Sequence, residues 1–425
     1  MSAELLWTFP FVILLASIAI FPLLNKFWWE KNYPFLATGL GLLTSCYYLF
    51  INPHPEALVR TAHEYISFIS LIASLYVVAG GIHIGVKGEA KPLVNCVFLF
   101  IGAVLANFFG TTGASMILVR PWIRMNKYRV TSFHIIFFIF IVSNVGGCLT
   151  PIGDPPLFLG YLRGVPFFWI LQSAWRAWLL CLAILLGIFY VLDRRNYLRA
   201  PKIIRERETA HESWKIEGKR NMFFLLIILG SVFINRPHFL REVLMASAAF
   251  FSWRLTPKRV HEKNDFNFSP ITEVAILFLG IFLTMIPALE WLEHHAADLG
   301  IRTPGQFYWT VGAVSSVLDN APTYLNFLTA ACGLLAPNQL SPNSQVAFLL
   351  SEHPQYVRAI SLGAVFFGAM TYIGNGPNFL VKSIADRSKI PMPSFFGYVC
   401  KYSLFYLLPV FALIWWVFYR SGSAF

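Results

Sequence analysis

Long apolar runs recur along the whole chain and alternate with short polar loops. A helix needs roughly 20 apolar residues to cross a hydrocarbon layer about 30 Å thick. Runs of about this length predict membrane-spanning helices at residues 5–24, 33–51, 65–84, 131–160, 166–192, 221–235, 239–253, 271–289, 357–381 and 395–419. We therefore expect an all-α polytopic membrane protein with about ten full crossings.

Two further apolar segments contain polar residues with glycine or proline near their centres. Residues 93–119 include Asn107-Phe-Phe-Gly-Thr-Thr-Gly, and residues 307–335 include Leu318-Asp-Asn-Ala-Pro-Thr. Irregular backbone at membrane depth is tolerated only where it lines a cavity inside the protein. These two segments predict re-entrant helical hairpins, each of which enters and leaves the membrane on one side, beside helices that are broken.

Positive charge predicts the orientation, because short cytoplasmic loops carry an excess of Lys and Arg. The loop 193–220 is the most basic in the chain and is expected to be a cytoplasmic linker. If the first hairpin opens inward and the second outward, most of the 33 Lys and Arg residues lie inside, and both termini lie outside. The net charge of +12 is then an orientation signal, so we expect no nucleic-acid partner.

The two halves of the chain have the same predicted series of crossings and hairpins, but in opposite orientation. Residues 1–192 form the first transmembrane repeat, and residues 221–425 form the second. Thr150-Pro-Ile-Gly-Asp-Pro-Pro aligns without gaps with Thr371-Tyr-Ile-Gly-Asn-Gly-Pro. This pattern predicts an inverted-topology repeat, an architecture in which secondary transporters bind their ions and substrates near the midplane at broken helices.

The composition agrees with a membrane protein and argues against a soluble enzyme. Hydrophobic residues make up 57% of the chain and charged residues 13%, whereas soluble domains have about 25% charged residues. The sequence has no phosphate-binding loop, no zinc-protease motif and no nucleophile elbow. We therefore expect no enzymatic activity and no resident cofactor, and an ion gradient as the source of energy.

Asp154 and Asp319 are the candidate carboxylates, because an ionisable group inside a span costs about 2.5–3.5 kcal/mol and is a functional candidate by default. Asp154 lies between Gly153 and two prolines, and Asp319 lies at the predicted tip of the second hairpin. Such a carboxylate can hold a proton or a small cation, such as a transported Na⁺, but not both easily. The alternative is that each aspartate only caps the N-terminus of a helix.

Hydroxyl and amide side chains near the predicted breaks are candidates to complete a cation site, because hard cations prefer oxygen ligands. The candidates are Asn107, Thr111, Thr112, Ser115, Ser143, Asn144, Thr150, Asn320, Thr323, Thr371, Asn375 and Asn378. The alternative for each residue is that it only allows helices to pack closely.

These segments resemble the ion transporter superfamily that includes NhaD-type sodium/proton antiporters, arsenite-efflux permeases and citrate or dicarboxylate carriers. The resemblance rests on Asn107-Phe-Phe-Gly-Thr-Thr-Gly, on the segment from Ser143 to Pro156, and on Leu318-Asp-Asn-Ala-Pro-Thr. It is closest to the antiporter branch. Carboxylate carriers of the superfamily have Ser-Asn-Thr motifs at the hairpin tips, and this chain has none there.

The resemblance leaves two hypotheses for the transported substances. The first is exchange of Na⁺ or Li⁺ for H⁺, with Asp154 and Asp319 alternately protonated and bound to the cation. The second is a Na⁺- or H⁺-coupled carrier of a small anion or organic acid, of the citrate or arsenite type. The resemblance also implies a prokaryotic inner membrane, with the lipid bilayer as surroundings, and a homodimer.

Overall fold

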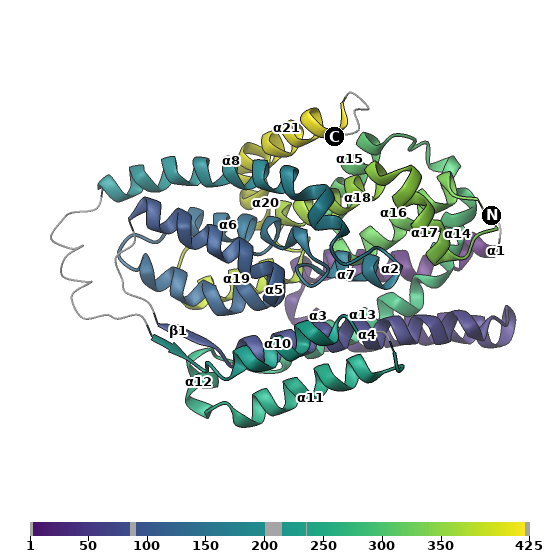
Figure 1. Ribbon diagram of the computed structural model, residues 1–425, viewed down its shortest axis with the longest axis horizontal. Helices are drawn as coiled ribbons and strands as arrows, with labels where there is room; N and C mark the ends of the chain where they lie inside the picture. Colours follow the sequence, from purple (N-terminus) through teal and green to yellow (C-terminus); the bar gives the residue numbers. More distant parts are fainter. Residues whose placement is uncertain (1–2, 86–90, 200–214, 235, 338, 421–425) are drawn as a thin grey trace.

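The protein is described by a computed structural model that covers residues 3–85, 91–199, 215–234, 236–337 and 339–420. It is predominantly helical, and many of its longer helices run along the long axis of the molecule (Figure 1). Within these ranges, seven helical segments are long and apolar enough to cross a membrane: Phe27–Ile51, Pro55–Gly80, Pro92–Met125, Ser132–Leu149, Trp169–Arg199, Ser269–Leu299 and Phe395–Tyr419. The chain is thus an all-α integral membrane protein.

The first part of the chain contains several long helices, and one of them, α5, has a break inside it. The elements are α1 (Ala3–Leu6), α2 (Phe9–Leu24), α3 (Lys26–Cys46) with a π-helical end η1 (Tyr47–Ile51), α4 (Pro55–Gly80), β1 (His83–Gly85), α5 (Pro92–Met125), α6 (Ser132–Ile141), the 3-10 turn η2 (Val145–Leu149), α7 (Pro155–Leu162) and α8 (Trp169–Arg199).

The second part has more and shorter helices. The elements are β2 (Lys215–Glu217), α10 (Asn221–Ser231), α11 (Leu240–Leu255), α12 (Lys258–Lys263), α13 (Ser269–Thr284), α14 (Ile286–His295), η3 (Ala296–Leu299), α15 (Pro304–Ser315), α16 (Asn320–Leu335), α17 (Pro342–Glu352), α18 (Pro354–Phe367), η4 (Gly368–Met370), α19 (Gly376–Arg387), α20 (Phe395–Tyr398), η5 (Val399–Leu407) and α21 (Leu408–Tyr419).

Several helix limits differ from the predicted spans. α4 starts ten residues earlier than predicted, because Pro55 is well suited to the first turn of a helix, and it ends at Gly80, before the predicted end at residue 84. α8 continues to Arg199, so the first residues of the predicted linker are helical. α10 has 11 residues and α11 has 16, shorter than a typical crossing.

A small antiparallel sheet was not predicted. Strands β1 and β2 pair, with Ile84 opposite Ile216. Ile84 lies at the end of an apolar run and Ile216 in a basic loop, so neither strand has an alternating pattern of its own.

Strand β1 and helix α12, which carry or adjoin basic residues, lie near each other at one end of the molecule (Figure 1). The β1–β2 pairing joins the end of α4 to the segment before α10. Arg120 near the end of α5 forms an ion pair with Asp265 at 3.0 Å, and Lys263 of α12 pairs with Glu217 of β2. These contacts join three of the basic segments, and the side of the membrane on which they lie stays a prediction.

Helix α5 turns back on itself at its centre. Gly110 has a φ of 71° and a ψ of 157°, and these non-helical angles break the helix. Glycine adopts a positive φ more readily than any other residue. Asn95 near the start of α5 donates a hydrogen bond to Asn126 just after its end, at 2.8 Å. A straight helix would hold these two residues about 46 Å apart, so the two halves of α5 lie antiparallel.

Helices α15 and α16 also fold back on each other. The rings of Phe307 and Phe327 are in contact, with their centroids 6.3 Å apart, although 20 residues separate them. The turn between these helices ends at Asp319, directly before α16. Each segment that was predicted to be a hairpin therefore has a break close to its polar centre.

Candidate functional site

The breaks in four helical segments meet in the interior around the carboxylate of Asp154. This side chain is 1% exposed and lies on an extended stretch directly before α7. Thr111, just after the break in α5, donates a hydrogen bond to Oδ1 at 2.7 Å, and Asn375, before α19, donates to the same oxygen at 3.0 Å. Asn320, the first residue of α16, donates to Oδ2 at 2.6 Å. Sequence segments from both halves of the chain therefore form one site.

The hydrogen-bond donors to Asp154 are neutral hydroxyl and amide groups. Among the described residues no Lys, Arg or His forms an ion pair with this carboxylate. Burying a charge without a partner of opposite charge is costly, so a proton or a bound cation is expected to accompany the carboxylate. Oδ1 of Asn320 is buried, has no hydrogen-bond partner in the described part of the chain, and can serve as a further oxygen ligand beside it.

The ends of helices add partial charges to this site. Four helical segments begin at Asp154 or beside the residues that bond to it: α7, α16, α19 and the part of α5 that follows Gly110. The N-terminus of a helix carries a partial positive charge and unpaired N–H groups that favour anions. Helices α6 and α18 end before the breaks on the same two segments, and their carbonyl ends carry the opposite partial charge. The site therefore has features suited to both a cation and an anion.

The stretches before α7 and α19 have the same local geometry. Thr150 and Thr371 are extended, and each hydroxyl accepts a hydrogen bond from the N–H of the glycine three residues later, at 3.1 Å in both cases. The Thr150 hydroxyl donates to the carbonyl of Asn107 at 2.7 Å, and the Thr371 hydroxyl donates to that of Ser316 at 2.5 Å. Each threonine thus joins its broken helix to the neighbouring turn by hydrogen bonds to backbone atoms. Its hydroxyl stabilises the local backbone and does not contact Asp154.

Two glycines in the first of these stretches approach each other closely. A Cβ atom on Gly153 would overlap the backbone carbonyl of Gly147, whereas a Cβ on Gly376, in the equivalent region of the second half, would meet no atom within 4 Å. We expect Gly153→Ala to destabilise the protein by about 1–3 kcal/mol, as overpacking does, and Gly376→Ala to have little effect. Thermal unfolding of both variants in detergent tests this, and equal stabilities would contradict it.

Other predicted ligands mainly hold the backbone together. The Asn107 amide donates to the Gly146 carbonyl at 2.8 Å, and its oxygen accepts from the Leu149 N–H at 2.9 Å, which ties α5 to η2. The hydroxyl of Thr323 donates to the carbonyl of Asp319 within the first turn of α16. These residues stabilise the breaks and do not contact Asp154.

A chain of buried polar side chains continues from Asp154. Asn375 also donates to Oδ1 of Asn144 at 3.1 Å, and Asn144 donates to Oδ1 of Asn378 at 2.7 Å. The hydroxyls of Ser115 and Ser143 are 2.7 Å apart. The structure therefore brings most of the predicted polar residues into one connected interior region.

The two candidate aspartates have different surroundings. Asp154 occupies the N-cap position of α7 but makes no side-chain capping bond, so its carboxylate is available to the site. Asp319 is half-buried, and its Oδ1 accepts a hydrogen bond from the Ala321 N–H at 3.0 Å. The capping alternative thus fits Asp319 and does not fit Asp154.

A small cavity of about 30 Å³ lies between α4 and the breaks near Asp154. Leu71 and Leu75 of α4 face Gly110, Thr112 and Pro151 across it. This volume can hold an ion or a water molecule, but not an organic acid. In this conformation the cavity therefore leaves no room for a larger solute beside α4.

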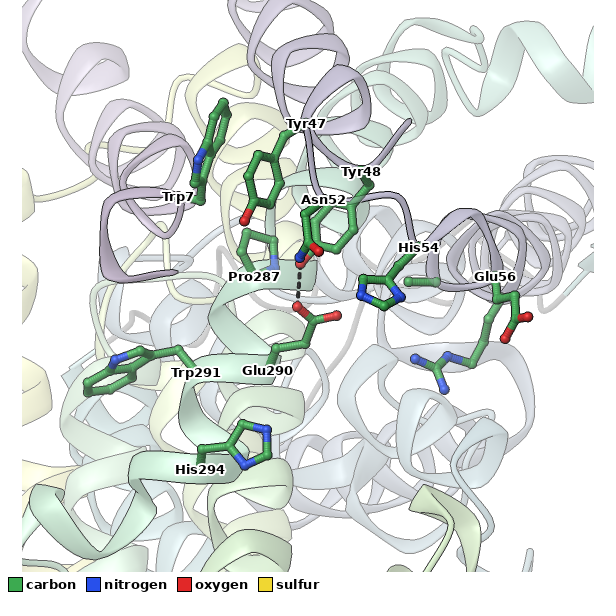
Figure 2. Close-up of a pocket in the computed structure, with 12 residues that line it drawn as sticks. Trp7, Tyr47, Tyr48, Asn52, His54, Glu56, Pro287, Glu290, Trp291 and His294 are labelled. Atoms are coloured by element: carbon green, nitrogen blue, oxygen red, sulfur yellow. Dashed lines mark hydrogen bonds between the residues drawn. The ribbon is translucent and has the colours of Figure 1, made fainter. Parts of the chain in front are cut away.

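A larger cavity of about 430 Å³ lies at the opposite end of the molecule from the β-sheet, between η1, the start of α4 and α14 (Figure 2). Its walls combine aromatic rings, such as Tyr47 and Trp291, with charged side chains. The Tyr48 hydroxyl donates to Glu290 at 2.5 Å. Arg60 and Glu290 also line a second cavity of about 60 Å³ that runs beside α16, so the two cavities adjoin.

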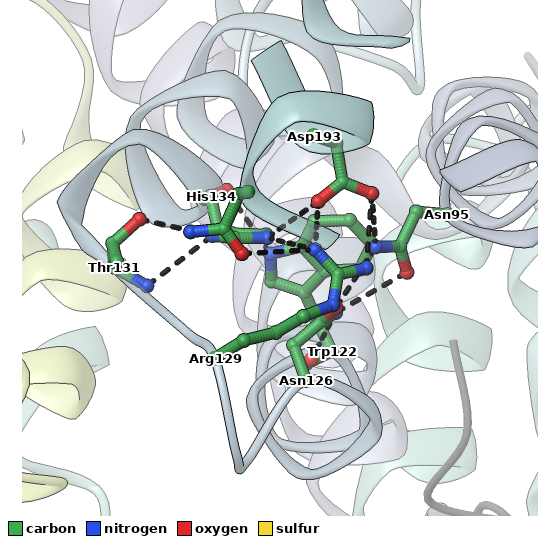
Figure 3. A network of polar contacts seen from close by, with 8 residues as sticks. Asn95, Trp122, Asn126, Arg129, Thr131, His134 and Asp193 are labelled. Atoms are coloured by element: carbon green, nitrogen blue, oxygen red, sulfur yellow. Dashed lines mark hydrogen bonds and ion pairs between the residues drawn. The ribbon is translucent and has the colours of Figure 1, made fainter. Parts of the chain in front are cut away.

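The two ends of α5 meet α8 at a point that we call the base of α5. A buried charged network lies there and was not predicted as part of any site (Figure 3). Asp193 of α8 is fully buried and pairs with Arg129 through both carboxylate oxygens. Asn95 donates to Asp193 at 2.8 Å. The Thr131 N–H donates to Nδ1 of His134, so the ring proton is on Nε2 and is donated to Asp193 at 2.9 Å. These residues lie in three separate segments, and an aspartate inside the last turns of an apolar helix is the signal that could have revealed them.

Comparison with known proteins assigns the chain to a family. Residues 1–419 match the family described as putative citrate transport. Two proteins named as uncharacterized transporters, from two strains of Mycobacterium tuberculosis, are each 23% identical over 331 residues, which are 72% of this chain and 72% of the relative. The match favours the citrate-carrier side of the resemblance, and no comparison supports sodium/proton exchange. This family is a transport family and not an enzyme family, and its relatives here are bacterial. The chain therefore belongs to this citrate transport family of the ion transporter superfamily.

Proposed function

We propose that this protein is a secondary carrier that moves a small organic anion of the citrate class together with a cation or proton held at Asp154. The family match supports the anion, because it covers nearly the whole chain. The buried carboxylate supports the coupling. The second hypothesis from the sequence thus takes precedence over sodium/proton exchange, which stays a prediction without support from the family.

The surroundings of Asp154 carry this proposal. An ionised carboxylate at the centre of the site repels a polycarboxylate anion, so the anion binds well only after the carboxylate has been neutralised. A proton on Asp154, or a Na⁺ between Asp154 and Oδ1 of Asn320, provides this neutralisation. Binding of the cation and of the anion therefore favour each other, which couples the two fluxes.

The anion is expected to bind at the helix N-termini that surround Asp154. The start of α7, of α16 and of α19 supply partial positive charge without a Lys or Arg side chain. Thr111 and Asn375, which already contact Asp154, can adjust their hydrogen bonds between the carboxylate and the bound ions. We propose Asp154, Thr111, Asn320 and Asn375 as the transport site.

The small cavity requires a conformational change before an organic acid can bind. We propose that α4 separates from α5 and α7, opening a route along the cavities that Arg60 and Glu290 line. Arg163, just after α7, pairs with Glu64 of α4 at 3.0 Å, and this ion pair would break during the opening. Arg60 and Arg163 are basic groups along this route that can attract an anion.

The re-entrant hairpins and the inverted repeat are part of the same proposal. The fold-back of α5 at Gly110 and the equal geometry at Thr150 and Thr371 support two related halves, residues 1–192 and 221–425. In such repeats the two broken helices cross at the midplane and form the transport site between them.

The test is uptake of labelled citrate into proteoliposomes that contain the purified protein. We expect an inward Na⁺ gradient or an inward proton gradient to concentrate citrate about tenfold or more, a concentration ratio that requires about 1.4 kcal/mol from the gradient. An ionophore that dissipates the gradient is the control and should abolish accumulation. Movement of protons upon addition of Na⁺, without any uptake of citrate, would contradict the proposal and favour exchange.

A further inference from the structure

A groove of about 570 Å³ lies between the start of α15 and the end of α21, close to each other in Figure 1. Its aromatic side chains come from Trp309 of α15 and from Trp415, Phe418 and Tyr419 of α21. Gln306 and Arg420 contribute polar groups. The groove is far larger than the cavity beside Asp154 and is not part of the proposed transport route.

Positive charge gathers at this groove. Arg420 lines it, and Arg302 directly precedes the lining residue Thr303. Arg358 lies with its guanidinium 5.7 Å from the centre of the Tyr419 ring. The described residues that line the groove include no Asp or Glu. These arginines are on the side predicted to be outside, where a membrane protein has few basic residues, so they give the groove a local excess of positive charge that suits an anion.

The position of the groove indicates that it faces the lipid headgroups. It lies at the end of the candidate span Phe395–Tyr419, and tryptophan and tyrosine are enriched at this depth. Trp416, next to the groove, is 53% exposed, and its ring lies 6.0 Å from the guanidinium carbon of Arg420. An exposed apolar surface on a span is expected to contact acyl chains.

We propose that this groove binds an anionic phospholipid. The phosphodiester would lie against Arg420, with Gln306 as a neutral hydrogen-bond donor, because guanidinium groups match the geometry of phosphate oxygens. The upper part of an acyl chain would lie along Trp309 and Trp415. A volume of about 570 Å³ is within the usual range for a site that encloses a ligand of this size in part.

The test compares the thermal stability of the full-length protein in detergent with different additives. We expect phosphatidylglycerol to raise the unfolding temperature by about 3 °C or more, because a ligand that binds only the folded state stabilises it. Phosphatidylcholine and soluble glycerol phosphate should have little effect. Equal stabilisation by phosphatidylcholine, or by glycerol phosphate, would overturn the proposal, the latter by indicating a site for soluble phosphate.

Substitutions of the arginines test whether stabilisation by phosphatidylglycerol arises at the groove. The double variant Arg302→Gln/Arg420→Gln should lose the response to phosphatidylglycerol. Arg420→Lys should retain only part of it, because the charge is kept but the fork of guanidinium donors is lost. Arg236→Gln, which alters an exposed arginine between α10 and α11, is the matched control and should respond like the wild type. Native mass spectrometry that counts bound lipid provides a second measurement. A double variant that still binds and responds to phosphatidylglycerol would overturn the proposal.

Discussion

Replacing Asp154 with Asn is expected to abolish gradient-driven accumulation of citrate, by about 100-fold or more in initial rate, equivalent to about 2.7 kcal/mol. Asn has nearly the same shape and fits among Thr111, Asn320 and Asn375, so the fold should persist. However, Asn cannot be protonated and binds Na⁺ weakly. Because it imitates the neutralised carboxylate, the variant should bind citrate with an affinity that no longer depends on Na⁺ or pH. Isothermal titration and uptake assays measure these two properties.

Asp319→Asn is the matched control for this experiment. Asn is as good an N-cap as Asp, and the observed role of Asp319 is to cap α16. We expect this variant to accumulate citrate at close to the wild-type rate. Gradient-driven accumulation by Asp154→Asn, with an unchanged response to Na⁺ and pH, would contradict the coupling role of Asp154.

The second large effect is expected at the base of α5, where Asp193→Ala should destabilise the protein by about 3–5 kcal/mol. The substitution would leave the charge of Arg129 buried and would remove the acceptor for Asn95 and His134 (Figure 3). Chemical or thermal unfolding in detergent measures the loss.

Two controls test whether the loss of stability comes from leaving a buried charge without a partner, and not from the loss of a negative charge as such. Asp386→Ala breaks the more exposed pair with Lys382 on α19 and should change stability by less than about 0.5 kcal/mol. The double variant Arg129→Gln/Asp193→Asn should cost less than the sum of the two single variants, because neither charge is left alone. A small effect of Asp193→Ala would mean that water reaches this carboxylate in solution.

The sequence predicted the helix breaks at the centre of the candidate site, because the signals for breaks are local. Proline, glycine and aspartate within an apolar segment indicate a break, and breaks in such proteins meet at the midplane. The contact of Asp154 with Asn320 and Asn375 follows from that rule. The different roles of Asp154 and Asp319 depend on which backbone N–H groups lie within reach, and this information is absent from the sequence pattern.

The position of Asp193 in an apolar helix could have marked it as unusual, but its partners could not be predicted, because they are distant in sequence. Asn95 and Asp193 are 98 residues apart, and Asn95 looks like an ordinary polar residue at the end of an apolar helix. The short helix α17 and the β1–β2 sheet were missed for a related reason. Their residues adopt regular structure through contacts with other segments and not through a pattern of their own.

The identity of the solute was the weakest inference from the sequence. A carboxylate with neutral oxygen ligands indicates a coupling cation, which is common to antiporters and to coupled anion carriers. The anion is expected to bind to backbone N–H groups at helix ends, and these leave no residue type as a signature. The family match favours the anion carrier.

The bonds that hold the two ends of α5 together also affect how motion reaches Asp154. The hydrogen bonds between Asn95 and Asn126 and the pair with Asp193 fix both ends of α5 to α8, whereas Gly110 and Thr111 form the far tip. Such a segment acts as a lever with an arm of about 22 Å, the length of 15 helical residues. A rotation of about 5° at the base would displace the tip by about 2 Å, enough to break the 2.7 Å hydrogen bond from Thr111 to Asp154. A small tilt of α8 would thus be amplified into a change at the carboxylate.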